Sequence, residues 1–322
     1  MAAQRLTQAV ETLRSGGLVA FPTETVYGLG ADALNPAAVA KVFAAKGRPA
    51  DHPLIVHLAA SSALPDWAVD VPDEAYGLAG RFWPGPLTLI LTRHPRVPGA
   101  VTGGQATVGL RVPAHPVAQR LLEAFGSGVA APSANRFGKL SPTTAAHVRA
   151  EFGGGVFVLD GGPCEVGLES TIVDLSGAAP RLLRPGGVSL SALEAVLGRS
   201  VSVKGENAPR APGTLASHYA PATPVRLLAA EGFEERLRSL AAGNSVAVLA
   251  RRGRPADARV TSWLELPDEP AAYGRGLYAA LRELDAVGAD LIAVEAVPEG
   301  EPWEAARDRL LRAAQSALEE EK

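Results

Sequence analysis

The chain changes its pattern once, between residues 201 and 224, and this change limits what it can fold into. That segment is rich in Pro, Gly, Ala and Ser and has no clear hydrophobic period, which is typical of a linker. Strands and helices are mixed before it and alternate regularly after it. The sequence therefore predicts two domains, 1–200 and 225–322, joined by a linker long enough to act as a lid.

The first segment mixes strand-like apolar runs with amphipathic helical patterns. Asn35 and Pro36 are typical of a helix start, and Gly47 is typical of its end. Because the elements do not alternate strictly, the pattern favours a mixed-sheet α/β domain with α+β character. The predicted strands are Leu18–Phe21, Leu54–Leu58, Leu87–Thr92, Thr107–Val112, Gly128–Ala131, Val156–Leu159 and Thr171–Leu175, and the later helices lie near 73–83, 115–125, 142–151 and 189–198.

The last hundred residues alternate strands with helices. Such alternation predicts a small parallel sheet of Rossmann-like type. The predicted strands are Val225–Ala229, Ser245–Ala250, Val260–Leu266 and Leu291–Val297, and the helices are Phe233–Ala242, Ala271–Val287 and Glu304–Leu318.

The charge of each half argues against a dedicated nucleic-acid-binding protein. Residues 1–190 contain 15 Lys and Arg against 14 Asp and Glu, a net of +1, and residues 191–322 contain 16 against 20, a net of −4. Neither half has the basic excess expected of phosphate-backbone binding. Cys164 is the single cysteine, and no apolar run reaches the ~18 residues of a membrane span. We expect no membrane association, no strong nucleic-acid binding and a cytoplasmic location.

Recognisable catalytic motifs are absent. The sequence has no P-loop, no convincing GxGxxG, no HExxH, no CxxC and no GxSxG. A bound nucleotide would therefore be held by scattered groups.

Two cations follow the first long helix. Lys46 ends it, and Arg48 lies between Gly47 and Pro49. They could simply complement the negative end of the helix dipole. They could instead bind phosphate, with arginine as a planar fork and lysine as a point charge.

Further polar groups stand at the ends of predicted strands, and each has a structural alternative. Ser133 follows one such strand, and Ser141 is a good cap for a helix that begins at Pro142. Arg111 lies among apolar neighbours and needs a partner, either a structural carboxylate such as Asp32 or Asp160 or a substrate carboxylate. Histidine in an apolar strand, as at His57, is more often a core residue than a catalytic base, and Arg184 is predicted to be an exposed turn residue.

The motifs together resemble the threonylcarbamoyl-AMP synthase family. They are PTETVYGLG, KGRP, PLIVHL, GLRVP, APSAN, ESTIVD, LLRPG and a late HYAP, in that order along nearly the whole chain. The resemblance implies a first domain with a YrdC-like twisted, open mixed sheet, in the two-domain form. It also implies synthesis of threonylcarbamoyl-AMP from L-threonine, bicarbonate and ATP. The product then supplies a downstream tRNA threonylcarbamoyl transferase, and Mg²⁺ is held mainly by the ATP phosphates.

The same resemblance assigns roles to individual residues. Lys46 and Arg48 become the catalytic candidates, with no protein ligand set for a metal. Two positions depart from the expected pattern: His52 is often Asn in relatives, and Pro212–Tyr219 lacks a basic residue. The implied threonine site is Thr25, His57, Arg111, Ala131 and Thr171, and the implied nucleotide site is Arg48, His52, Thr107, Ser133, Ser141, Arg184 and Tyr219.

Three other functions stay open on the residues alone. A related enzyme could form another carbamoyl adenylate or transfer a carbamoyl group. The chain could instead be a non-catalytic RNA-binding module, or a small-molecule sensor whose second domain binds a partner.

Overall fold

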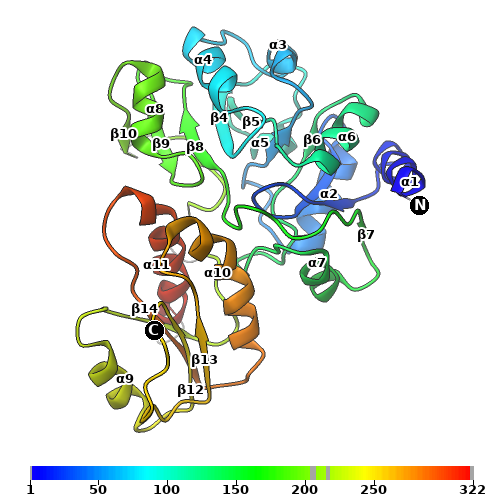
Figure 1. The fold of residues 1–322 in the computed structure, drawn as a ribbon. Helices are drawn as coiled ribbons and strands as arrows, with labels where there is room; N and C mark the ends of the chain where they lie inside the picture. Colours follow the sequence, from blue (N-terminus) through cyan, green and yellow to red (C-terminus); the bar gives the residue numbers. More distant parts are fainter. Residues whose placement is uncertain (1, 204–207, 215–217, 320–322) are drawn as a thin grey trace. The chain divides into compact units, whose positions relative to one another are not determined.

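The chain forms two compact units, seen here in a computed structural model that describes residues 2–203, 208–214 and 218–319. The first unit is Met1–Phe137 with Pro142–Thr214, and the second is Gly138–Ser141 with Leu215–Lys322 (Figure 1). The fold class predicted above is confirmed in both units. The domain limits 1–200, 201–224 and 225–322 stay a prediction.

A mixed sheet forms the centre of the first unit. Within the described residues its strand order is β10-β9-β8-β4-β5-β3-β6-β2-β1-β7, with both parallel and antiparallel pairs. Its strands are β1 (Val19–Phe21), β2 (Gly28–Asp32), β3 (Ile55–His57), β4 (Leu87–Thr92), β5 (Thr107–Arg111), β6 (Val129–Ala130), β7 (Phe157–Val158), β8 (Thr171–Asp174), β9 (Arg181–Arg184) and β10 (Ser202–Val203).

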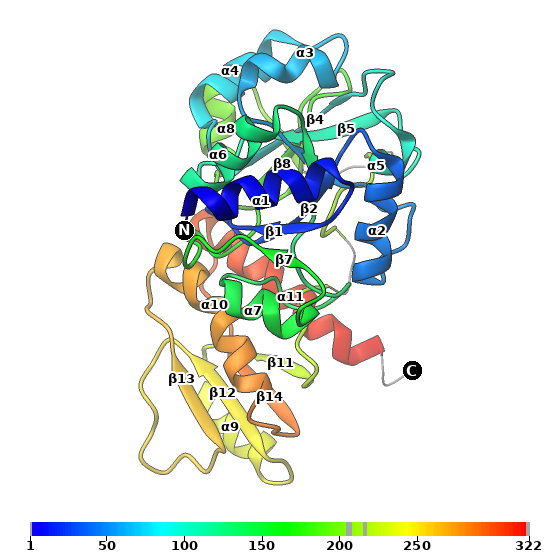
Figure 2. The same cartoon turned by 90° about the vertical axis from the view of Figure 1, so that its right-hand side faces the viewer.

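Helices pack around this sheet (Figure 2). The predicted cap of α2 is confirmed, because the Asn35 side chain accepts hydrogen bonds from Ala37 N and Ala38 N. Gly47 ends α2 with φ +64°, a left-handed conformation that favours glycine. The helices are α1 (Ala2–Arg14), α2 (Pro36–Lys46), α3 (Leu64–Trp67), α4 (Asp73–Phe82), α5 (Gly99–Thr102), α6 (Pro116–Phe125), α7 (Ala145–Phe152) and α8 (Leu190–Leu197), with a 3₁₀ turn, η1 (Ser61–Ala63).

Sequence reasoning missed strand β2, because its glycines do not favour a strand on their own. The packing explains them. A Cβ on Gly30 would lie 2.8 Å from the ring of Phe21 and 2.7 Å from Val129, so a larger residue would separate β2 from its neighbours. Strands β9 and β10 were also missed.

The second unit has a four-stranded parallel sheet in the order β11-β14-β12-β13. Helix α9 covers one face, where Phe233 and Leu237 pack on Val246 and Val248, and α10 contacts the sheet and α11 (Figure 1). The elements are β11 (Val225–Leu228), α9 (Phe233–Ala241), β12 (Val246–Ala250), β13 (Ser262–Glu265), α10 (Pro270–Asp285), β14 (Leu291–Glu295), η2 (Glu301–Trp303) and α11 (Glu304–Glu319).

In the described part of the chain, no helix is both long enough and apolar enough to cross a membrane.

Candidate active site

One face of the sheet in the first unit carries three of the predicted site residues, His57, Thr107 and Arg111. Ile55 and His57 of β3 stand in register with Gly109 and Arg111 of β5. Because side chains alternate along a strand, Thr107 also faces this side. The opposite face carries the main core, including Val56 and Leu110. This side is therefore the one on which polar groups can meet a ligand.

Arg111 is almost fully buried, at 4% exposure, and its partner is Glu24. Its Nη2 donates to Glu24 Oε1 at 2.5 Å, Nη1 donates to Thr25 Oγ1 at 2.9 Å, and Nε donates to Gly85 O at 3.2 Å. The structural carboxylates suggested from the sequence, Asp32 and Asp160, were therefore wrong. The sequence places Glu24 between two threonines after a buried strand, and that was the available signal.

His57 lies in the neighbouring strand and is 4% exposed. Its ring stands edge-on to Phe21, with ring centroids 5.9 Å apart. Burial, assisted by the charge of Arg111, lowers the pKa of His57 to about 3, although the carbonyls of Ile55 and Val129 slightly oppose this shift. The imidazole is therefore neutral at physiological pH, and its Nδ1 has no hydrogen-bond partner of good geometry among the described residues.

The two remaining threonine-site candidates are buried and differ in what their side chains can do. Ala131 follows β6 and donates its N–H to Ile55 O at 2.9 Å. The Thr171 hydroxyl is already engaged, because it donates to Val188 O at 2.7 Å and accepts from Val188 N at 2.9 Å. Thr171 thus holds the turn after β9, and its side chain offers little to a substrate.

Lys46 is buried and anchors the loop after β6. Its Nζ donates to Ser133 O at 2.7 Å and to Asn135 O at 2.5 Å, and its own carbonyl accepts from Phe137 N at 2.8 Å. Burial, followed by the charge of Arg48, lowers the pKa of Lys46 well below its ordinary value. Ser133 is half-buried and also pairs with Gly28 through a backbone bridge. Lys46 therefore positions this loop and does more than complement the end of α2.

Arg48 and His52 meet at one aromatic ring. The Arg48 guanidinium lies 5.7 Å from the centroid of Phe137, and the His52 ring stands edge-on to it at 5.3 Å. Arg48 Nη2 also donates to Pro53 O at 3.0 Å. Burial, and then the charge of Arg48, lowers the pKa of His52. Phe137 was not predicted, and it links two of the predicted nucleotide residues.

Arg184 is 3% exposed, so the prediction of an exposed turn residue was wrong. It ends β9, and its guanidinium is directed inward. Nε donates to Ser170 O at 3.0 Å, Nη2 donates to Ser170 Oγ at 3.1 Å, and Nη1 donates to Pro212 O at 2.9 Å. The Ser170 hydroxyl also lies 2.8 Å from that of Thr88 on β4.

Two predicted nucleotide residues belong to the second unit. Ser141 is buried but is not a helix cap: α7 begins at Ala145, and Thr144 caps it by accepting from His147 N. Tyr219 is buried against Tyr278, with centroids 5.9 Å apart, and the Arg309 guanidinium lies 5.2 Å from its ring. Ser217, before this tyrosine, lies outside the described residues.

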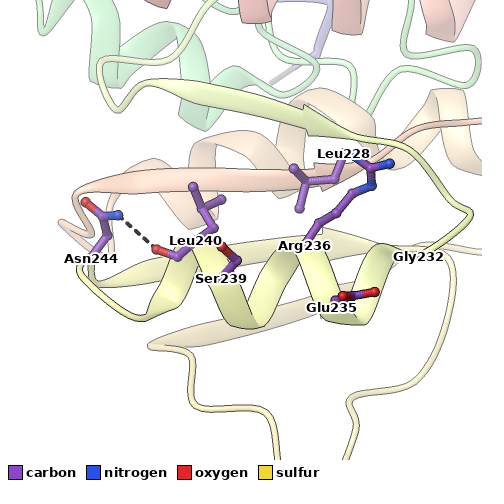
Figure 3. A pocket seen from close by; sticks show the side chains of 7 residues that line it. All are labelled: Leu228, Gly232, Glu235, Arg236, Ser239, Leu240 and Asn244. Atoms are coloured by element: carbon purple, nitrogen blue, oxygen red, sulfur yellow. Dashed lines mark hydrogen bonds between the residues drawn. The ribbon is translucent and has the colours of Figure 1, made fainter.

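The described side chains include no group of three His, Cys, Asp or Glu residues that could hold a metal ion. A separate open hollow of about 620 Å³ lies beside α9 in the second unit (Figure 3). Figure 3 shows Asn244 there, donating to Leu240 O at 2.8 Å. Its lining residues Glu235 and Arg236 have opposite charges, and none of the predicted site residues lies in it.

The first unit thus combines a buried arginine–carboxylate pair, a neutral histidine and a separate group of buried cations with hydroxyls. Such a site suits a small ligand that carries a carboxylate and phosphates, bound without a protein nucleophile. The fold and the site together define a two-domain α/β protein built for such a ligand.

Comparisons with known proteins agree with this class. A family model described as "Telomere recombination" matches residues 11–186, and one described as "Threonylcarbamoyl-AMP synthase, C-terminal domain" matches residues 188–315. Threonylcarbamoyl-AMP synthase of Pyrococcus abyssi is 44% identical over 317 residues, which cover 94% of this chain and 92% of that protein. The Bacillus subtilis protein of that name is 42% identical over 325 residues, covering 96% and 93%. A crystal structure of P. abyssi Sua5 complexed with L-threonine superposes with a TM-score of 0.91 at 41% identity, covering 98% of this chain and 96% of that one.

The chain belongs to the threonylcarbamoyl-AMP synthase family. It is therefore an enzyme, a transferase of the nucleotidyl type with a role in tRNA modification. A non-catalytic RNA-binding module or a sensor does not fit this membership.

Proposed function

We propose that this chain converts L-threonine, bicarbonate and ATP into threonylcarbamoyl-AMP and pyrophosphate on the polar face of its first unit. The observation that carries the proposal is the arrangement around Arg111. Its guanidinium is buried and oriented by three protein acceptors, and it lies on the same face of the sheet as His57. An arginine held in this way suits bidentate binding of a carboxylate.

The threonine end of the site is formed by Thr25, His57 and Arg111, with the backbone of Ala131 beside them. Arg111 binds the α-carboxylate. His57 is uncharged, so it contributes a hydrogen-bonding ring without repelling a substrate amine. Thr171 shapes this end through the turn that its hydroxyl holds.

The nucleotide end uses the remaining cations and hydroxyls. Arg48 and Arg184 supply buried positive charge, and Lys46 holds the loop that contains Ser133. Thr107 begins β5, four residues from Arg111, so the two side chains stand about 13 Å apart on one face. At this separation Thr107 could contact the nucleotide while Arg111 binds the amino acid. Ser141, His52 and Tyr219 complete the proposed contacts to ATP.

The chemistry follows from positioning and charge. The amine of threonine combines with bicarbonate to give a carbamate and water. A carbamate oxygen then attacks the α-phosphorus of ATP, the bond from that phosphorus to the bridging oxygen breaks, and pyrophosphate leaves. The step needs no enzyme nucleophile, because buried cations aligned with the phosphates stabilise the developing charge. Mg²⁺, bound mainly through the phosphates and water, would neutralise part of the phosphate charge.

We further propose a cytoplasmic location and delivery of the product to a downstream tRNA threonylcarbamoyl transferase. Carbamates and mixed anhydrides react readily with water, so a site that excludes water and hands over its product promptly is favoured.

Pyrophosphate release tests the function. The purified chain should release pyrophosphate from ATP only when L-threonine, bicarbonate and a divalent metal are all present. Equal release without threonine, or none with every component, contradicts the proposal.

A further inference from the structure

Glu24 is a buried carboxylate to which the proposed reaction gives no role. It lies in the loop between β1 and β2 and is 5% exposed. Its Oε1 accepts from Arg111 Nη2 at 2.5 Å, and its Oε2 accepts from Ala114 N at 2.9 Å. A carboxylate can accept about four hydrogen bonds, so each oxygen keeps capacity for a further donor.

Arg111 also has N–H donors that the protein does not use, and their positions on the guanidinium can be assigned. A guanidinium has five N–H groups, and the protein uses one each on Nε, Nη1 and Nη2. The two N–H groups left without a partner among the described residues therefore belong to Nη1 and Nη2. Two neighbouring donors of this kind match the two oxygens of one carboxylate.

The charges of this pair decide which ligand it can accept. Both side chains are almost completely buried, at 5% and 7% exposure, so their charges are poorly screened. A purely anionic ligand at Arg111 would lie close to the Glu24 carboxylate and be repelled by it. An α-amino acid carries an ammonium beside its carboxylate, with the two groups about 2.5 Å apart across one carbon. That cation removes the repulsion and can use the free capacity of Glu24.

We propose that Glu24 and Arg111 form a two-charge site for the head group of an α-amino acid, in which Arg111 binds the carboxylate and Glu24 binds the ammonium. This inference rests on the proposed function and adds the group that recognises the amine. Neighbouring His57 is neutral, so it does not supply the negative charge that an ammonium requires. The charge pair therefore selects for a zwitterion over a simple hydroxy acid.

The test compares two ligands by calorimetric titration. L-Threonine carries both charges, and 3-hydroxybutanoate is threonine without the amine. In the Glu24→Gln variant, affinity for L-threonine should fall about ten- to hundredfold, as expected for loss of a charged hydrogen bond. Affinity for 3-hydroxybutanoate should stay equal or rise, because the repelling charge is gone.

A matched control removes a different buried carboxylate from the same unit. Asp174 pairs with Arg181 at 2.8 Å and is fully buried. Asp174→Asn should lower the thermal stability but leave the ratio of the affinities for L-threonine and 3-hydroxybutanoate unchanged.

The outcomes separate the possibilities. If Glu24→Gln lowers the affinities for L-threonine and 3-hydroxybutanoate equally, Glu24 only orients Arg111. That result overturns the inference, while the proposed function stands. If Glu24→Gln does not fold, the wild-type protein decides: 3-hydroxybutanoate binding as tightly as L-threonine overturns the inference, and a strong preference for L-threonine supports it. A wild-type protein that binds no threonine overturns the proposed function itself.

Discussion

His57 and Arg111 occupy paired positions on the neighbouring parallel strands β3 and β5. A permanent cation thus stands beside a buried imidazole, and burial together with this charge keeps the ring unprotonated. The pair gives the site one fixed positive charge and one neutral ring, and it makes the stability of the first unit depend on pH.

The pKa of His57 predicts the direction of that dependence. The pKa of His57 is 6.5 in the unfolded chain and about 3 in the folded chain. Between these two values, the imidazole is protonated in the unfolded chain and neutral in the folded chain. The stability of the wild type, relative to a His57→Gln variant, should therefore fall by about 2 kcal/mol between pH 7 and pH 5. Urea unfolding of both proteins across this range measures the difference. A difference that does not change with pH would show that the folded ring is protonated normally.

Arg111→Lys should affect threonine far more than ATP. Lysine keeps the charge but loses the fork, so the KM for L-threonine should rise about tenfold or more while the KM for ATP changes little. Arg181→Lys is the matched control, because Arg181 also pairs with a buried carboxylate, Asp174. A similar rise in both KM values, or a general loss of folding, would make Arg111 structural.

Arg48→Ala should weaken ATP binding, and more strongly at low salt, where the phosphate charges are least screened. The guanidinium also lies near Phe137, so some stability should be lost as well. Lys41→Ala on α2, the helix that precedes Arg48, is the control: it removes an ammonium that donates to Gly16 O. Titrations of ATP at two salt concentrations distinguish the roles. If ATP affinity is unchanged and the melting temperature falls, Arg48 only complements the negative end of the helix dipole.

Elements with a strong local signal were predictable from the sequence. The cap at Asn35 and the strand Leu87–Thr92 were found because propensity, capping and hydrophobic pattern agree there. Strand β2 was missed because Gly30 is required by close packing on Phe21 and Val129, which no local pattern reveals. The predicted cap at Ser141 was wrong because a second good cap, Thr144, lies three residues further on.

The candidate site was likewise predictable only in part. The sequence indicates which residue types belong to the site, but it does not reveal their partners far away in the chain. The pairing of Arg111 with Glu24 spans 87 residues, and the inward turn of Arg184 depends on Ser170 and Pro212. An exposed arginine and a buried, bonded arginine look alike in a turn motif, because burial is decided by the rest of the chain.

Residues 208–214 of the predicted lid belong to the first unit and already pack on it. Gln105 holds the backbone of Arg210 from both sides, accepting from its N–H at 2.8 Å and donating to its carbonyl at 3.1 Å. Ala211 packs into an apolar group with Ile55 and Ile172 of the sheet. The neighbouring residues 204–207 and 215–217 lie outside the described part of the chain.

This segment should become more protected when the site is filled. Trypsin can cut after Arg210, and addition of ATP and threonine together should slow cleavage near 205–220 if the linker closes over the bound substrates. Tyr219→Ala should abolish that protection and lower turnover. Gln105→Ala should speed cleavage without ligands, because it removes two hydrogen bonds that hold the backbone at Arg210. The rate of fragment appearance on a gel measures each effect. If the cleavage rate is the same with and without ligands, and Tyr219→Ala turns over normally, the segment is a passive tether between two independent units.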